Sequence, residues 1–292
     1  MTEHTITTSD GRRLAVYESG DPDGRPIVAI YGTPMGGTPY VKHDEDARAR
    51  GIRLVTYDRP GYGGSDSRPG REVADCIDDV SEIADALGLG RFAVWGVSGG
   101  GPHALACAAL LGDRVAAVAS LASVAPYGAE GLDWLDGMGE DNLEEFGLTV
   151  AGREALEPYL QRQAAGLASL GPSALTEIWA SLLTPVDAAV ATDDLAAFLL
   201  GNTNTALAER VDGWLDDDLA FSRHWGFGLD EIAVPVLLVQ GEQDRFVPPS
   251  HGRWLAERIP GVDARLLDGD GHLTLIEHRV PEVHGWLLEH LG

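Results

Sequence analysis

Short apolar runs alternate with amphipathic stretches along most of the chain. Several runs are rich in β-branched and aromatic residues, as is typical of strands buried in a parallel sheet; they are residues 27–31, 52–57, 92–97, 115–121 and 234–240. A further strand is predicted at 264–267, and residues 5–8 and 14–18 predict an antiparallel edge hairpin. Between strands, apolar residues recur at helical spacing, as from Val73 to Leu87. We therefore expect an α/β fold whose central sheet, of about eight strands, is mostly parallel and covered by helices on both faces.

The pattern changes between residues 126 and 229, where no buried strand is predicted. Helical patterns at 154–170, 173–183 and 187–200 are interrupted by glycine and proline. Such a block within an α/β chain is typical of a helical insertion. We expect an α/β core made of residues 1–125 and 230–292, and a helical lid, or cap, made of residues 126–229.

A serine stands between one predicted strand and the helix that follows it. Ser98 is flanked by Gly96 and Gly100 in the pattern Gly-x-Ser-x-Gly. A tight turn here would hold the serine in a strained backbone conformation, and side chains at the flanking positions would collide with their neighbours. The backbone N–H of Gly99 would then point at a developing oxyanion. An ordinary serine on a glycine-rich turn is the alternative, and the strand and helix around it favour a nucleophile.

A serine nucleophile needs a base and an acid that orients the base. Asp244 and His272 both follow late predicted strands, and the carboxyl ends of parallel strands meet at one edge of a sheet. The chain order Ser, Asp, His accompanies this kind of turn. We predict a triad of Ser98, Asp244 and His272; other carboxylates beside these strands are Glu242, which competes with Asp244, and Asp268 and Asp270, which would act only through local contacts.

The loop after residues 27–31 is a candidate for the second oxyanion donor. Gly32 precedes Thr33, whose backbone N–H lies at the end of a strand beside that of Ser98. Pro34 would then fix the turn. A plain glycine-proline loop is the alternative interpretation.

The chain resembles the α/β-hydrolase fold superfamily in its lidded branch, which includes small-molecule esterases, meta-cleavage-product hydrolases and proline iminopeptidase-like peptidases. The resemblance rests on Gly32-Thr33-Pro34, Asp58-Arg59-Pro60-Gly61-Tyr62-Gly63-Gly64-Ser65, Gly96-Val97-Ser98-Gly99-Gly100, Gly241-Glu242-Gln243-Asp244 and Gly271-His272. One departure is Tyr31, which stands where the family usually has histidine, so that a supporting hydrogen bond is expected to be rearranged. Serine at position 98 argues against the relatives with an aspartate nucleophile, and the lid has no lysine for the lyase branch.

The resemblance and the triad together predict a serine hydrolase that needs no cofactor and no metal. We expect it to cleave a carboxylic ester, or a related acyl bond, of a small and partly hydrophobic substrate. Lid aromatics, among them Trp134, Phe146 and Trp179, would supply the hydrophobic surface, unless they only pack the lid onto the core. Two alternatives stay open: an aminopeptidase whose lid acids bind a free amine, with candidates Glu144, Glu145, Glu154 and Glu157, and a ligand receptor that keeps the pocket with little turnover.

The charge of the chain argues against two classes of partner. The 46 acidic residues outnumber the 21 basic ones and give a formal net charge of −25. Such a surface repels nucleic-acid phosphates and anionic lipid headgroups, so neither nucleic acid nor membrane is expected as a partner. Cys76 and Cys107 have no metal-ligand spacing, and neither a signal peptide nor a membrane span is predicted. The sequence thus indicates a cytoplasmic protein that acts on a small molecule.

Overall fold

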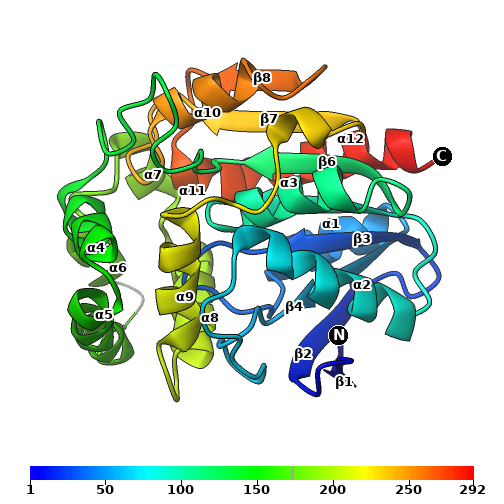
Figure 1. Ribbon diagram of the computed structural model, residues 1–292, viewed down its shortest axis with the longest axis horizontal. Helices are drawn as coiled ribbons and strands as arrows, with labels where there is room; N and C mark the ends of the chain where they lie inside the picture. Colours follow the sequence, from blue (N-terminus) through cyan, green and yellow to red (C-terminus); the bar gives the residue numbers. More distant parts are fainter. Residues whose placement is uncertain (172–173) are drawn as a thin grey trace.

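The computed structural model describes residues 1–171 and 174–292, and eight strands form one sheet in the order β1-β2-β4-β3-β5-β6-β7-β8 (Figure 1). Strand β2 pairs antiparallel with β1 and β4, whereas every pair from β4 to β8 is parallel. The predicted mostly parallel sheet is confirmed. The strands are β1 (Thr2–Thr7), β2 (Arg13–Gly20), β3 (Arg25–Ile30), β4 (Ile52–Tyr57), β5 (Phe92–Val97), β6 (Val115–Leu121), β7 (Val236–Gly241) and β8 (Asp263–Leu267).

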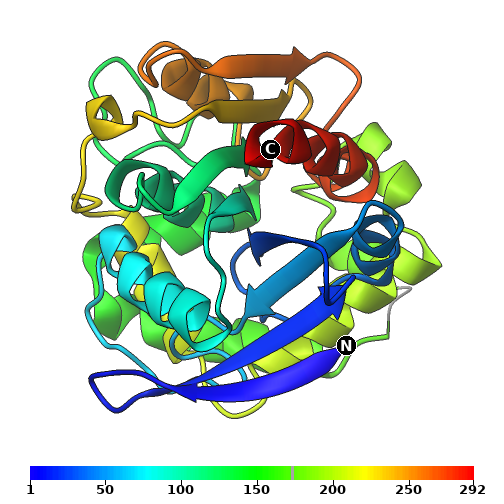
Figure 2. The same ribbon diagram turned by 90° about the vertical axis from the view of Figure 1, so that its right-hand side faces the viewer.

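Two hydrophobic cores lie on opposite faces of the sheet. Along β5, Phe92 and Val94 pack into one core, while Ala93, Trp95 and Val97 pack into the other. This alternation follows from the two-residue period of a strand. Helices α1 (Val41–Ala49) and α12 (Val280–Leu291) cover the face of Trp95, and α2 (Cys76–Ala86), α3 (Gly100–Leu110) and α10 (Pro249–Ala256) cover the other (Figure 2).

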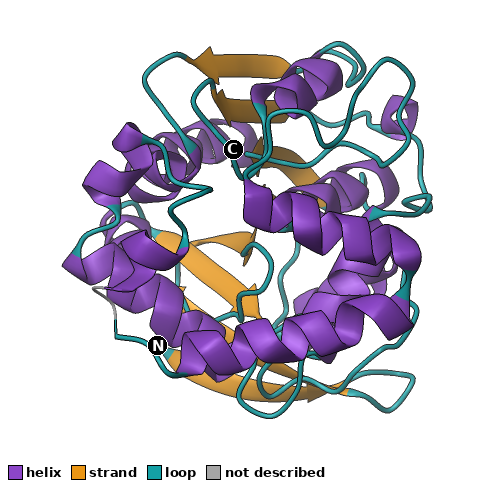
Figure 3. Ribbon diagram, turned by 90° about the vertical axis from the view of Figure 1, so that its left-hand side faces the viewer, coloured by secondary structure: helices purple, strands orange, loops and turns teal. Residues whose placement is uncertain are grey.

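The chain between β6 and β7 is helical. Figure 1 shows these helices gathered at one side of the sheet, and from that side they lie in front of the strands (Figure 3). They are α4 (Glu140–Ala151), α5 (Arg153–Ala168), α6 (Leu175–Ile178), α7 (Pro185–Val190), α8 (Asp193–Ala206) and α9 (Asp212–Phe221). No helix within residues 1–171 and 174–292 has the length and apolar composition needed to cross a bilayer.

Two helical predictions differ from the structure in this region. The pattern at 187–200 is split into α7 and α8, because Thr192 takes an extended conformation at the N-cap of α8 (φ −97°, ψ −178°). The pattern at 173–183 starts outside the described residues, and the part that follows contains only the four residues of α6.

Candidate active site

Ser98 occupies the turn between β5 and α3. Its φ is 55°, and among the described residues only Ser98 and Ala122 combine a positive φ with a side chain. A Cβ at Gly96 would collide with the Gly100 carbonyl, and one at Gly100 with the Ile30 carbonyl. Because both flanking positions must lack a side chain, the Gly-x-Ser-x-Gly pattern specifies this strained turn.

His272 and Asp244 are in direct contact. His272 Nδ1 lies 2.7 Å from Asp244 Oδ2, and both side chains are buried. The other oxygen, Oδ1, accepts the backbone N–H groups of Phe246 and Val247, each at 2.8 Å. The carboxylate is thereby fixed from the side opposite the imidazole. Burial would lower the pKa of His272, but the charge of Asp244 and its hydrogen bond outweigh burial and raise the pKa.

The competing carboxylates have other partners. Glu242 forms an ion pair with Arg253, and Asp270 pairs with Arg279 at 2.6 Å. Neither is bonded to the His272 ring, so the structure favours Asp244 as the residue that orients it.

Ser98 lines a cavity, and Phe246 connects the His272–Asp244 pair to the wall of that cavity. Ser98 lines its wall together with Phe246, and the Phe246 ring stacks on that of His272 with 4.6 Å between centroids. Ser98 and His272, both in the described part of the chain, make no hydrogen bond with each other. In proteins without a bound substrate, such contacts are often longer than in the reacting complex.

Thr33 and Gly99 lie side by side next to Ser98. Both line the cavity, and a Cβ at Gly99 would collide with the Thr33 hydroxyl. Among the described residues, neither backbone N–H donates to a protein acceptor. Two unused donors beside a serine can bind an oxygen that gains negative charge.

Tyr31 is anchored away from the cavity. Its hydroxyl accepts the Tyr40 N–H at 3.0 Å and lies 3.0 Å from His43 Nδ1. The hydrogen bonds that support this loop are thus arranged around a phenol and a neighbouring buried histidine.

The cavity wall combines aromatic and acidic side chains. Phe146 and Trp179 line it, whereas Trp134 lies outside, where its Nε1 donates to the Ala125 carbonyl at 2.6 Å. Of the candidate lid acids, Glu145 lines the wall; Asp141 and Asp218, which the sequence reading did not single out, join it there. Burial raises the pKa of Glu145 and of Asp218, and the charge of Glu145 raises that of Asp218 further.

Two buried aspartates on the helices between β6 and β7 were also missed from sequence. Asp187, on α7, accepts the backbone N–H groups of His272 (3.0 Å), Leu273 (2.7 Å) and Thr274 (3.2 Å). Asp217, on α9, accepts a hydrogen bond from the Thr33 hydroxyl at 2.7 Å. In a chain with 46 acidic residues, nothing in the sequence marks these two as buried.

Comparison with known proteins shows which proteins this chain is similar to. A model of the α/β-hydrolase fold matches residues 25–163. The chain has the α/β-hydrolase fold. It is 23% identical, over 94% of its length and 91% of the relative's, to a 2-hydroxy-6-oxononadienedioate/2-hydroxy-6-oxononatrienedioate hydrolase of Burkholderia vietnamiensis.

Two further similarities cover different shares of the chain. A proline iminopeptidase of Xylella fastidiosa is 32% identical over 35% of this chain and 34% of its own. A thermophilic esterase from Thermogutta terrifontis aligns over 100% of both chains with a TM-score of 0.71 and 20% identity, which is a likeness of fold.

Proposed function

We propose that the protein is a serine hydrolase that cleaves a carboxylic ester of a small, partly hydrophobic substrate through an acyl-enzyme. One observation carries the proposal: Ser98 stands on a strained turn in a cavity wall, beside two unused backbone donors. The buried His272–Asp244 pair adjoins the same cavity through Phe246. A nucleophile, an oriented base and an oxyanion site are the parts that acyl transfer requires.

In the proposed reaction, Ser98 Oγ attacks the ester carbonyl while His272 takes the hydroxyl proton. Asp244 holds the ring and stabilises the imidazolium. The N–H groups of Thr33 and Gly99 bind the tetrahedral oxyanion. Its collapse releases the alcohol, which receives the proton from His272. A water molecule, deprotonated by His272, then attacks the acyl-enzyme, releases the carboxylic acid and restores the Ser98 hydroxyl.

We assign the helical insertion, residues 126–229, the role of a lid over a core of residues 1–125 and 230–292. Phe146 and Trp179 from the insertion and Phe246 from the core line the cavity together, which supports this division. Their apolar rings suit a hydrophobic acyl or aromatic group of the substrate.

An aminopeptidase is a second candidate, favoured by the acidic part of the cavity wall. Asp218 is 1% exposed, and its Oδ2 has no hydrogen-bond partner among the described residues. An ammonium group placed between Asp218 and Glu145 would satisfy that oxygen and favour ionisation of both carboxyls. The partial similarity to a proline iminopeptidase points in the same direction.

The Ser98→Ala variant tests the serine mechanism. We expect it to lose hydrolysis of p-nitrophenyl acetate and butyrate by at least about 10³-fold, because no other group supplies the nucleophile. Its circular dichroism spectrum and unfolding temperature should match those of the wild type. Full activity in a folded variant would eliminate the mechanism.

A comparison of ester and anilide substrates separates the two candidate functions. The ester reading predicts that p-nitrophenyl esters are cleaved with a higher kcat/KM than prolyl or alanyl p-nitroanilides, and that Glu145→Gln leaves ester cleavage within about threefold. The aminopeptidase reading predicts the reverse preference and a loss on blocking the free amine by acetylation. A protein that binds such compounds yet fails to react with a fluorophosphonate would instead be a ligand receptor.

A further inference from the structure

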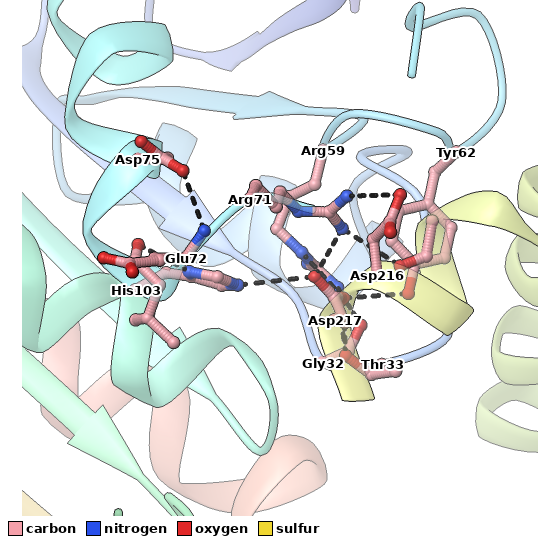
Figure 4. Close-up of polar contacts among 12 residues, drawn as sticks. Gly32, Thr33, Arg59, Tyr62, Arg71, Glu72, Asp75, His103, Asp216 and Asp217 are labelled. Atoms are coloured by element: carbon pink, nitrogen blue, oxygen red, sulfur yellow. Dashed lines mark hydrogen bonds and ion pairs between the residues drawn. The ribbon is translucent and has the colours of Figure 1, made fainter. Parts of the chain in front are cut away.

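Five side chains converge on the carboxylate of Asp217 in the interior of the protein (Figure 4). Oδ2 accepts hydrogen bonds from Thr33 Oγ1 (2.7 Å), Arg59 Nη2 (2.7 Å) and the Tyr62 hydroxyl (2.8 Å). Oδ1 accepts one from Arg71 Nη2 (2.7 Å) and lies 3.5 Å from His103 Nε2. Asp217 itself comes from α9, so a residue of the insertion sits at the centre of a cluster built by the core.

The cluster keeps Asp217 ionised. Its side chain is fully buried, which alone would raise the pKa, but Arg59 and Arg71 hold the pKa well below the ordinary value. A buried carboxylate with several donors is rigid, since each lost bond would leave an unpaired charge in the interior.

Arg59 connects Asp217 to the loop beside Ser98. Its guanidinium donates to the carbonyls of Tyr31 and Gly32, the latter at 3.1 Å, while it also binds Asp217. The Gly32 carbonyl and the Thr33 N–H belong to one planar trans peptide unit, so they point in opposite directions. Fixing the carbonyl on Arg59 therefore fixes the direction in which the Thr33 N–H points. The Thr33 hydroxyl, bonded to Asp217, restrains the same residue from its side chain.

We propose that Asp217 is a positioning residue for oxyanion binding, which acts through Arg59 and the Thr33 hydroxyl to aim the Thr33 N–H at the reacting oxygen. The inference rests on the proposed serine hydrolase function. It gives the insertion a role beyond covering the cavity, because α9 anchors one of the two oxyanion donors. Such positioning acts on the transition state, where the oxygen carries charge, more than on bound substrate.

The Thr33→Val variant isolates this effect, because it removes the hydroxyl and keeps the backbone N–H and the side-chain shape. We expect kcat for a p-nitrophenyl ester to fall about 10- to 100-fold with KM within about twofold. Affinity for a trifluoromethyl ketone, whose adduct with Ser98 carries the oxyanion, should fall by the same factor. Thr33→Ser keeps the hydroxyl and should retain most of both.

Thr8→Val is the matched control. Thr8 is buried, whereas Thr33 is half-buried; like Thr33 it donates to an aspartate, Asp10, at 2.5 Å, but in the hairpin turn away from the cavity. It should lower the unfolding temperature without changing kcat. The Thr33 hydroxyl acts through Asp217. The kcat of the Thr33→Val/Asp217→Asn double variant should therefore be close to that of Asp217→Asn alone. If Asp217→Asn fails to fold, the comparison of Thr33→Val with Thr33→Ser and Thr8→Val still tests the positioning role.

The outcomes separate this proposal from the one it rests on. If the wild type hydrolyses esters and Thr33→Val matches Thr8→Val in kcat and ketone affinity, or changes KM alone, the positioning role is wrong and the serine mechanism stands. If the wild type neither cleaves esters nor binds the ketone, both proposals are overturned.

Discussion

At the scale of single residues, the turn around Ser98 depends on two positions that have no side chain. Gly96 and Gly100 lack the Cβ atoms that would strike backbone carbonyls of the neighbouring helix and strand. Backbone atoms cannot rotate away as a flexible side chain can, so the steric demand at these two positions is strict.

Replacing Gly100 by alanine should therefore damage both stability and activity. We expect the unfolding temperature to fall by several degrees and ester hydrolysis to fall at least about 10-fold, since β3 and the Ser98 turn must move apart. Gly166→Ala is the matched control, because a Cβ there, in the last turn of α5, meets nothing within 4 Å, and it should be neutral or stabilise by up to roughly 0.5–1 kcal/mol. Calorimetry and initial rates measure both; a stable, active Gly100→Ala protein would contradict the steric account.

The pKa of His272 determines the direction of the expected pH dependence. Its pKa is raised, mainly by the charge of Asp244, and only the neutral ring can accept the Ser98 proton. Activity should thus be lost as the pH falls through a pKa above the ordinary value of about 6.5.

Asp244→Asn removes the charge that raises this pKa. The acid limb of the kcat/KM profile should move to lower pH, and kcat should fall about 10³- to 10⁴-fold, because the ring loses its orientation and its counter-charge. A profile measured on an ester without titratable groups tests both effects. An acid limb that stays in place in the variant would mean that Asp244 does not control His272.

At the scale of elements, the loops at the carboxyl ends of the strands are held by the helices between β6 and β7 as well as by the sheet. Asp187 places its carboxylate against three consecutive N–H groups at the start of the short helix α11 (His272–Thr274). An anion at a helix start satisfies otherwise unpaired donors.

Asp187→Asn should loosen the backbone of His272, because an amide offers one acceptor oxygen where the carboxylate offers two. We expect the free energy of unfolding to fall by about 1–3 kcal/mol and kcat to fall more than KM changes. Asp136→Asn, which changes an exposed acid in a turn between β6 and α4, is the control and should alter neither. Denaturant unfolding and steady-state kinetics check the prediction, and a variant as active and stable as the control would remove Asp187 from the account.

The sequence predicts elements well where sterics or a repeating pattern restricts which residue types a position can hold. Buried strands, the Ser98 turn and the Asp244–His272 contact follow from apolar runs, from glycines and from chain order. Trp134 and Asp217 show the limit. Trp134 does not line the cavity and packs behind Phe146, which does. Asp216, Asp217 and Asp218 form an acidic run that is fully buried on α9. Their partners come from segments far away in the chain, such as Arg59, Arg71 and Arg153, so local pattern could not reveal them.

At the scale of the whole molecule, the formal net charge of −25 opposes the compact state. Self-repulsion of surface carboxylates is screened by salt, whereas buried pairs such as Arg59 and Asp217 are screened much less.

Raising sodium chloride from 20 to 500 mM should therefore raise the unfolding temperature by about 2–5 °C. Potassium chloride should act equally, because screening depends on ionic strength and not on the identity of the cation. Thermal unfolding followed by circular dichroism measures the shift. An unchanged or lower temperature in both salts would show that screened surface ion pairs outweigh the net repulsion.

The proposed reaction requires that Ser98 becomes acylated. The most direct measurement is to mix the protein with a p-nitrophenyl ester, quench in acid during the first turnovers and locate the added acyl mass by peptide mass spectrometry. We predict an acyl group on Ser98 in the wild type, its accumulation in a variant slowed in deacylation, and none in Ser98→Ala. Ester hydrolysis with no acyl mass on Ser98 in any of these proteins, or with the acyl group on another residue, would contradict the account.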